Sequence, residues 1–340
     1  MNDKALIGFV VHFITDESGR FAVTKKIIST VVVGFLLLCT VVVSATTGKI
    51  EVTYLEFITG IFDPNNDTMA AIRDLRFPRI FVAIFAGAAL SVAGVLLQAI
   101  MRNPLADAGI IGISTGAAFT KLVIVSLFPV YFFYAPIAAF IGGAIACFLV
   151  FLLSWKSGLN PLKLILVGIA INAVFTGLIE ALVSLGATNA GATTSSLTLK
   201  TWDDVTIIVL YGSIGLILAF VMYRWCNVLV LSDKTAKSIG FNVNGARIAI
   251  AAVAVLLSAV SVVVAGVIMF VGILVPHIAR RLVGYDHKIL IPFTALLGAF
   301  IVLLADTLGR TIIAPIEIPA STLMAIIGGP FLIFLIRKDK

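Results

Sequence analysis

Three ionisable residues lie inside long apolar stretches of the sequence: Lys121, Glu180 and Asp306. A charge at the centre of a bilayer is costly, so such residues are functional candidates by default. Asp306 and Arg310 are four residues apart, which favours a structural ion pair on one helix face. Glu180 fits either the wall of a transport pathway or a polar contact between helices. Lys121 can simply extend its ammonium to the membrane surface.

The other reactive residue types form no recognisable catalytic or metal-binding pattern. The three histidines lack a ligand-like partner at i+3 or i+4, and the three cysteines are far apart with no CxxC spacing. The sequence contains no GxxxxGK[ST] loop, GxSxG or HExxH motif. We therefore expect a chain that is not an enzyme, with no metal site, no cofactor and no ATPase site of its own.

The composition is typical of a polytopic membrane protein. Of the 340 residues, 61% are hydrophobic and 12% are charged, against about 45–50% and about 25% in soluble domains. Since a span needs about 20 residues, there is room for roughly ten spans and none for a large soluble catalytic domain. The net charge of +7 is scattered rather than gathered into a basic stripe, which argues against a nucleic-acid partner.

Charge-free stretches predict an all-α fold with about ten membrane helices in one domain over residues 27–340. The predicted elements are 27–46, 80–101, 110–128, 132–154, 162–185, 205–223, 248–267, 270–283, 289–308 and 321–336. Gly272 and Pro276 break the stretch 270–283, which therefore predicts a short turn plus a half-length helix. Residues 1–26 form a cytoplasmic N-terminal segment, either interfacial or disordered. Residues 102–112 contain Pro104 and two glycines, and so predict irregular chain near membrane depth.

Lysine and arginine gather on one side of the predicted helices, which places both termini in the cytoplasm. Against that bias, the outer loop of residues 47–79 ends in Arg73, Arg76 and Arg79. These arginines either flank the next helix at the headgroup level or dock an acidic partner. On the cytoplasmic side, residues 231–247 predict a short helix, because Ser232 can cap it and Gly240 can close it.

With these segments in place, the chain resembles the FecCD-type family of iron-chelate and cobalamin permeases, which belong to ABC importers. The matching stretches are LRFPRIFVAIFAGAALSVAGVLLQAIMRNPLADAGIIGISTGAA (75–118), AKSIGFN (236–242), GVIMFVGILVPHIARRLVGYDHKILIPFTALLGAFIVLLADTLGR (266–310) and EIPASTLMAIIGGPFLIFLI (317–336). They cover roughly half of the chain in the family's order. The stretch SSLTLKTWDD (195–204) and the EIPA sequence depart from many members and resemble Gram-positive permeases for haem or siderophores.

The resemblance implies a type II ABC importer permease in the plasma membrane that moves a ferric siderophore or haem inward. Its partners would be a second permease subunit (a copy or a paralogue), cytoplasmic ATPase subunits that bind ATP and Mg, and an extracellular binding lipoprotein. The rival class is an ion-coupled secondary transporter that uses Glu180 or Asp306.

The resemblance also implies roles for individual residues. The binding protein would dock on Arg76, Arg79 and Arg310. The ATPase would couple to the chain through Ser232, Asp233, Lys237, Gly240 and Arg247. The translocation path would be lined by Gly168, Asn172, Gly177, Gly328 and Gly329, with ordinary tight packing of these small residues as the alternative. Glu180 is the further candidate for the path that its place within a span suggests.

Overall fold

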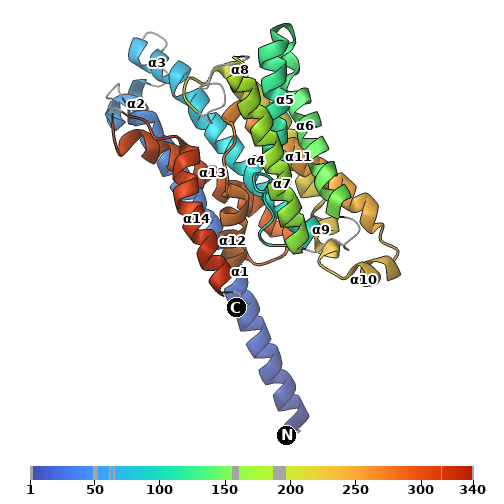
Figure 1. Ribbon diagram of the computed structural model, residues 1–340. Helices are drawn as coiled ribbons and strands as arrows, with labels where there is room; N and C mark the ends of the chain where they lie inside the picture. The colour runs from blue at the N-terminus through green and yellow to red at the C-terminus, as the bar shows by residue number, and fades with distance from the viewer. Residues whose placement is uncertain are drawn as a thin grey trace.

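The computed structural model describes residues 3–48, 53–60, 63, 66–154, 161–186, 197–314 and 316–338, and every regular element in these ranges is a helix. The elements are α1 (Asp3–Thr46), α2 (Tyr54–Gly60), α3 (Asp67–Leu75), α4 (Phe77–Met101), α5 (Ile113–Leu127), η1 (Pro129–Tyr134), α6 (Ala135–Ser154), α7 (Pro161–Ser184), α8 (Trp202–Val221), α9 (Tyr223–Leu229), α10 (Asp233–Ser238), α11 (Val243–Ala265), α12 (Val271–Val283), α13 (His287–Thr311) and α14 (Ala320–Lys338). They form one bundle (Figure 1).

The predicted membrane elements are all present, with differences at their ends. Seven segments of the described chain are long and apolar enough to cross a membrane, and α5 and α14 are shorter apolar helices. The half-length helix is α12, which keeps Gly272 and Pro276 inside one continuous helix. Sequence reasoning treated these two residues as breaks, which was wrong.

Helix α1 differs most from expectation, because it begins at Asp3 and runs for 44 residues. No proline interrupts residues 3–26, so the helix of the first span continues toward the N-terminus, and the disordered alternative for residues 1–26 does not hold for its described part. In Figure 1 the N-terminal part of α1 projects beyond the bundle. Which side of the membrane it lies on stays a prediction.

Helix α4 is the central helix of the bundle, with nearly all of its residues buried. It packs against α8, α11, α12 and α13. Two close approaches use glycine pairs, because a Cβ on Gly87 would lie 2.3 Å from the carbonyl oxygen of Gly298, and one on Gly94 would lie 2.2 Å from that of Gly272. Helices in a membrane associate through such small-residue contacts, which bring backbones together.

The segment between α4 and α5 is irregular, as the sequence predicts, and it is packed against protein. Arg102 ends α4 in the left-handed conformation with φ of 47°. The buried Asp107 carboxylate accepts a hydrogen bond from the backbone N–H of Gly109 at 2.7 Å, and Gln98 Nε2 donates to the carbonyl of Gly272 at 2.8 Å. These bonds satisfy backbone groups that could not face lipid.

Candidate functional site

Two charged clusters lie at opposite ends of α4. The arginine cluster, at its N-terminal end, consists of Arg76, Arg79, Arg310, Asp306 and Glu317. The second cluster lies at the C-terminal end of α4, where Arg102 follows the last turn of the helix and contacts α10. Since α4 has 25 residues and a helix rises 1.5 Å per residue, the two clusters are about 35 Å apart.

Arg79 is the centre of the arginine cluster and holds two carboxylates. Its Nη2 lies 2.8 Å from Asp306 Oδ1 and its Nε lies 2.9 Å from Asp306 Oδ2, a bidentate arrangement. Its Nη1 lies 2.8 Å from Glu317 Oε2. Asp306 is only 1% exposed. The ion pair expected within α13 also exists, but it is longer, with Arg310 Nε at 3.5 Å from Asp306 Oδ2.

The other two arginines of the cluster tie α1 to the bundle. Arg310 Nη2 donates to Ser44 Oγ at 2.6 Å, and Arg76 Nη1 donates to the carbonyl oxygen of Ala45. Arg76 and Arg79 are each 8% exposed. The three predicted docking arginines therefore lie in one cluster, and their side chains are largely engaged within the chain. Their docking role stays a prediction.

Glu317 belongs to this cluster and was missed by sequence reasoning. It lies after α13, where the Ile318 backbone N–H donates to the carbonyl of Gly309 at 2.8 Å and turns the chain back toward α4. Burial alone would raise the pKa of Glu317, but its hydrogen bond and ion pair with Arg79 outweigh burial and lower the pKa. The available signal was the EIPA sequence, an acidic residue in an otherwise apolar turn.

At the opposite end, α10 is built as the sequence predicts. The Ser232 side chain accepts a hydrogen bond from the Thr235 N–H at 3.1 Å and so caps the helix. Gly240 has φ of +78°, and the next N–H, of Phe241, bonds back to the carbonyl of Ala236 at 3.1 Å. These are the bonds of a glycine-terminated helix end.

Asp233 fastens α10 to the rest of the chain through two arginines. Its Oδ1 lies 2.7 Å from Arg102 Nη2 and 2.9 Å from Arg247 Nη2. Burial alone would raise the pKa of Asp233, but the two guanidinium groups outweigh it and lower the pKa. Arg102 was not among the predicted coupling residues, and no pattern in the sequence connects it to Asp233, which lies 131 residues away.

The side of α10 that points away from the bundle is exposed in the part of the chain that the structure describes. Lys237 is exposed, Ile239 is 63% exposed and the preceding Val230 is 65% exposed, whereas Ala236 is fully buried against the chain. A mixed apolar and basic surface on a short, firmly anchored helix is suited to contact another protein.

Two of the predicted path residues are closely packed against other segments. A Cβ on Gly168 would lie 2.8 Å from Ile111 Cα, and one on Gly328 would lie 2.4 Å from Phe270 Cβ. These glycines let α7 approach the irregular segment and let α14 approach the start of α12. Their first role is packing.

The remaining predicted path residues have more open surroundings. Gly177 and Glu180 are exposed on α7, and no atom lies within 4 Å of the position of a Cβ on Gly177 or Gly329. Asn172 is partly buried and its Oδ1 accepts a hydrogen bond from Thr115 Oγ1 at 2.8 Å. The open faces of α7 and α14 are thus available to line a path.

Lys121 makes a contact within the bundle, and its extension to the membrane surface stays a prediction. Its Nζ donates to the carbonyl oxygen of Val263 at 2.7 Å, and the side chain is partly buried. Since that carbonyl lies in the last turn of α11, where helix carbonyls lack intrahelical partners, the ammonium satisfies a helix end. Among the described residues, no three His, Cys, Asp or Glu side chains come together in a way that could hold a metal ion.

Comparison with known proteins gives consistent matches over most of the chain. Residues 35–338 match the model of the FecCD transport family. A Staphylococcus aureus (strain MSSA476) protein, "Probable heme-iron transport system permease protein IsdF", is 40% identical over 90% of this chain and 94% of its own length.

Two solved structures are similar in fold. A metal-chelate type ABC transporter in an inward-facing conformation superimposes with a TM-score of 0.77 and 29% identity, over 91% of this chain and 98% of that one. PsaBC from Streptococcus pneumoniae gives a TM-score of 0.57 at 16% identity, over 83% of this chain and 95% of that one, and shows the fold alone.

Proposed function

Because the chain belongs to the FecCD transport family, we propose that it is the permease subunit of an ABC importer that carries an iron chelate into the cytoplasm. The match over residues 35–338 carries this conclusion. The 40% identity to IsdF supports haem as the first chelate to test, with ferric siderophores as the alternative. ATP and Mg would act on separate ATPase subunits, since the sequence has no phosphate-binding loop.

The proposed topology places α10 in the cytoplasm and the arginine cluster on the outer face of the plasma membrane, with both termini inside. The excess of lysine and arginine on the α10 side supports this orientation. An ATPase would then bind against Lys237 and the surrounding exposed side chains. Helix α10, which Ser232 caps and Gly240 closes, would move with the ATPase. Asp233 and Arg247 would transmit that movement to α4 and α11.

On the outer face, Arg76, Arg79 and Arg310 would receive acidic residues of an extracellular binding protein. The five residues of the cluster are three arginines and two carboxylates, a set that favours an acidic partner. Arg79 already holds both carboxylates, so an acidic residue that docks at Arg79 would compete with two existing ion pairs. Exposed pairs contribute about 0–1 kcal/mol each, and docking would weaken with added salt.

The path would run along the open faces of α7 and α14 once a second permease subunit, a copy or a paralogue, covers them. Gly177, Glu180 and Gly329 would face it, with Asn172 beside them. Gly168 and Gly328 would hold the two helices in place. The rival, an ion-coupled transporter, has little support at Asp306, because that carboxylate is buried and held by two arginines.

The deciding experiment is uptake into proteoliposomes that hold this chain with the ATPase and binding protein of its own locus. We expect uptake of haem or a ferric siderophore to require ATP and to persist when an uncoupler collapses the proton gradient. Uptake that follows the proton gradient without ATP would overturn the proposal. Running haem and siderophore in parallel also identifies the chelate class.

Docking is tested separately by titrating the binding protein against Arg76→Gln and Arg310→Gln at low and high salt. We expect each variant to bind more weakly than wild type at low salt and the difference to shrink at high salt. Arg73→Gln, on the same outer segment, is the matched control. Equal weakening by all three substitutions would favour a general surface charge over specific docking.

A further inference from the structure

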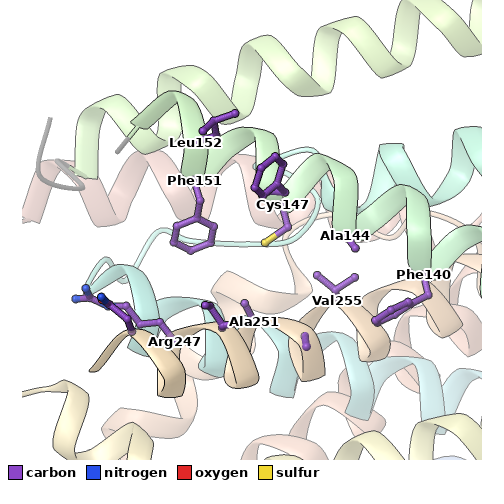
Figure 2. Close-up of a pocket in the computed structure, with 12 residues that line it drawn as sticks. Phe140, Ala144, Cys147, Phe151, Leu152, Arg247, Ala251 and Val255 are labelled. Atoms are coloured by element: carbon purple, nitrogen blue, oxygen red, sulfur yellow. The ribbon is translucent and has the colours of Figure 1, made fainter. Parts of the chain in front are cut away.

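A cavity of about 600 Å³ lies between α6 and α11, and one end of it reaches Arg247, the partner of Asp233 (Figure 2). Its lining is apolar over most of its length, with Phe140, Ala144 and Phe151 from α6 and Ala251 and Val255 from α11. Its volume is within the usual range of small-molecule sites, about 300–1,000 Å³. None of the roles proposed above uses it.

The cavity is polar at one end only. Arg247 and Asn244, both near the start of α11, are its two polar lining residues. In Figure 2, Arg247 and Phe140 lie at opposite ends of the cavity, and the labelled side chains between them line it from α6 and α11. The site thus has one cationic end and a long apolar body.

Its dimensions fit one leaflet of a bilayer. From Phe140 to Leu152, α6 rises about 18 Å at 1.5 Å per residue, close to the roughly 15 Å of half a hydrocarbon core. Phe148 is 63% exposed and Ile248 is 72% exposed beside the cavity, so the lipid-facing surface of the bundle gives access to it.

The cationic end keeps a net positive charge and unused hydrogen-bonding capacity. Arg102 and Arg247 share the single carboxylate of Asp233, which leaves one positive charge uncompensated within this group. Within the described chain, Arg247 Nε is buried and has no hydrogen-bond partner. Such an orphaned donor is unfavourable, and a phosphate is a strong acceptor for a guanidinium.

We propose that this cavity binds an anionic phospholipid of the leaflet on the α10 side, with an acyl chain between α6 and α11 and its phosphate at Arg247. Basic sites beside membrane helices bind acidic headgroups in this way. Because Arg247 also holds Asp233, the bound headgroup would share the guanidinium that anchors α10. The side of the membrane follows the proposed topology, but the site itself does not depend on it.

The test is native mass spectrometry of the purified full-length chain with phosphatidylglycerol or phosphatidylcholine at equal concentration. We expect phosphatidylglycerol to be retained about fivefold better. Both lipids carry a phosphate, but the choline ammonium cancels the net charge of phosphatidylcholine, so only phosphatidylglycerol gains from the uncompensated positive charge of the site. Arg247→Gln should abolish this preference. Water-soluble glycerol phosphate should not compete, because it lacks the acyl chain. Equal retention of the two lipids by wild type, or competition by glycerol phosphate, would overturn the proposal.

Filling the cavity supplies the matched comparison. Ala144→Phe and Ala251→Phe place a ring where the acyl chain would lie and should remove retention of both lipids. Ile145→Phe, on the neighbouring exposed position of α6, should behave as wild type. If the two cavity variants instead change the ratio of monomer to dimer and leave lipid retention intact, the face packs against a second copy and the proposal is wrong.

A second measurement needs no variant. Phosphatidylglycerol with a photoreactive group in its acyl chain should label peptides that contain Ala144 or Ala251 after irradiation, while labelling of exposed α8 positions such as Ile217 stays weaker. Uniform labelling of every lipid-facing helix would contradict a specific site. Transport activity plays no part in this readout, so its outcome is independent of the proposed importer function.

Discussion

Replacing Asp306 by asparagine tests whether the arginine cluster holds the outer end of the bundle together. The carboxylate is 1% exposed and accepts two short bonds from Arg79, at 2.8 Å and 2.9 Å. An asparagine keeps the size of the side chain but removes the charge and turns one acceptor into a donor. That donor would face a guanidinium that is itself buried.

The expected loss is large because one member of a buried ion pair remains without its partner. Such a change typically costs about 3–5 kcal/mol. Arg79 keeps Glu317, whose side chain is 37% exposed, and Arg310 keeps Ser44. These remaining contacts place the expected loss near the lower end, at about 3 kcal/mol.

Reversible unfolding of the purified chain in mixed micelles, titrated with SDS, measures this loss. Asp203→Asn is the matched control, because Asp203 is exposed in the first turn of α8 and should contribute no more than about 1 kcal/mol. The pair Arg79→Met with Asp306→Leu removes both charges and should lose less than the sum of its two single changes. A loss for Asp306→Asn no larger than that of Asp203→Asn would refute the reasoning.

Three further outcomes follow from the packing and the charges. Gly94→Ala should destabilise the bundle by about 1–3 kcal/mol, because its Cβ would lie 2.2 Å from the carbonyl oxygen of Gly272. Gly34→Ala should not destabilise it, since no atom lies within 4 Å of that Cβ position, and SDS titration compares the two variants. The stability difference between wild type and Asp233→Asn should be constant from pH 8 to about 5, because the carboxylate is ionised throughout that range. It should begin to fall near the ordinary carboxyl pKa of about 4 and be lost only below the lowered pKa of the folded state. Gly240→Val should destabilise the end of α10 by about 1–2 kcal/mol, because valine is strained at the φ of +78°. We expect stimulation of the ATPase to fall while affinity for the binding protein stays unchanged, and both are measured on the same variant.

The sequence by itself determined the class of protein and most of its helices. Long charge-free runs can be satisfied in a bilayer only as helices, so their positions follow from hydropathy alone. The cap of α10 could also be predicted, because Ser232 and Gly240 act on their immediate neighbours. The family followed from motifs that lie in a fixed order along the chain.

The N-terminal end of α1 could not be found in this way. Residues 3–26 carry charges that end a membrane span but do not end a helix. Similarly, Gly272 and Pro276 have low helix propensity, yet both lie within α12 because packing against α4 outweighs that preference.

Only the tertiary structure decided which charges meet. Arg79 is 227 residues from Asp306 and 238 from Glu317 in the sequence, and no local pattern connects them. The same is true of Arg102 and Asp233, and of the cavity that α6 and α11 form around Arg247. Hydropathy and capping act between neighbours along the chain, whereas an ion pair or a cavity depends on how helices far apart in sequence cross.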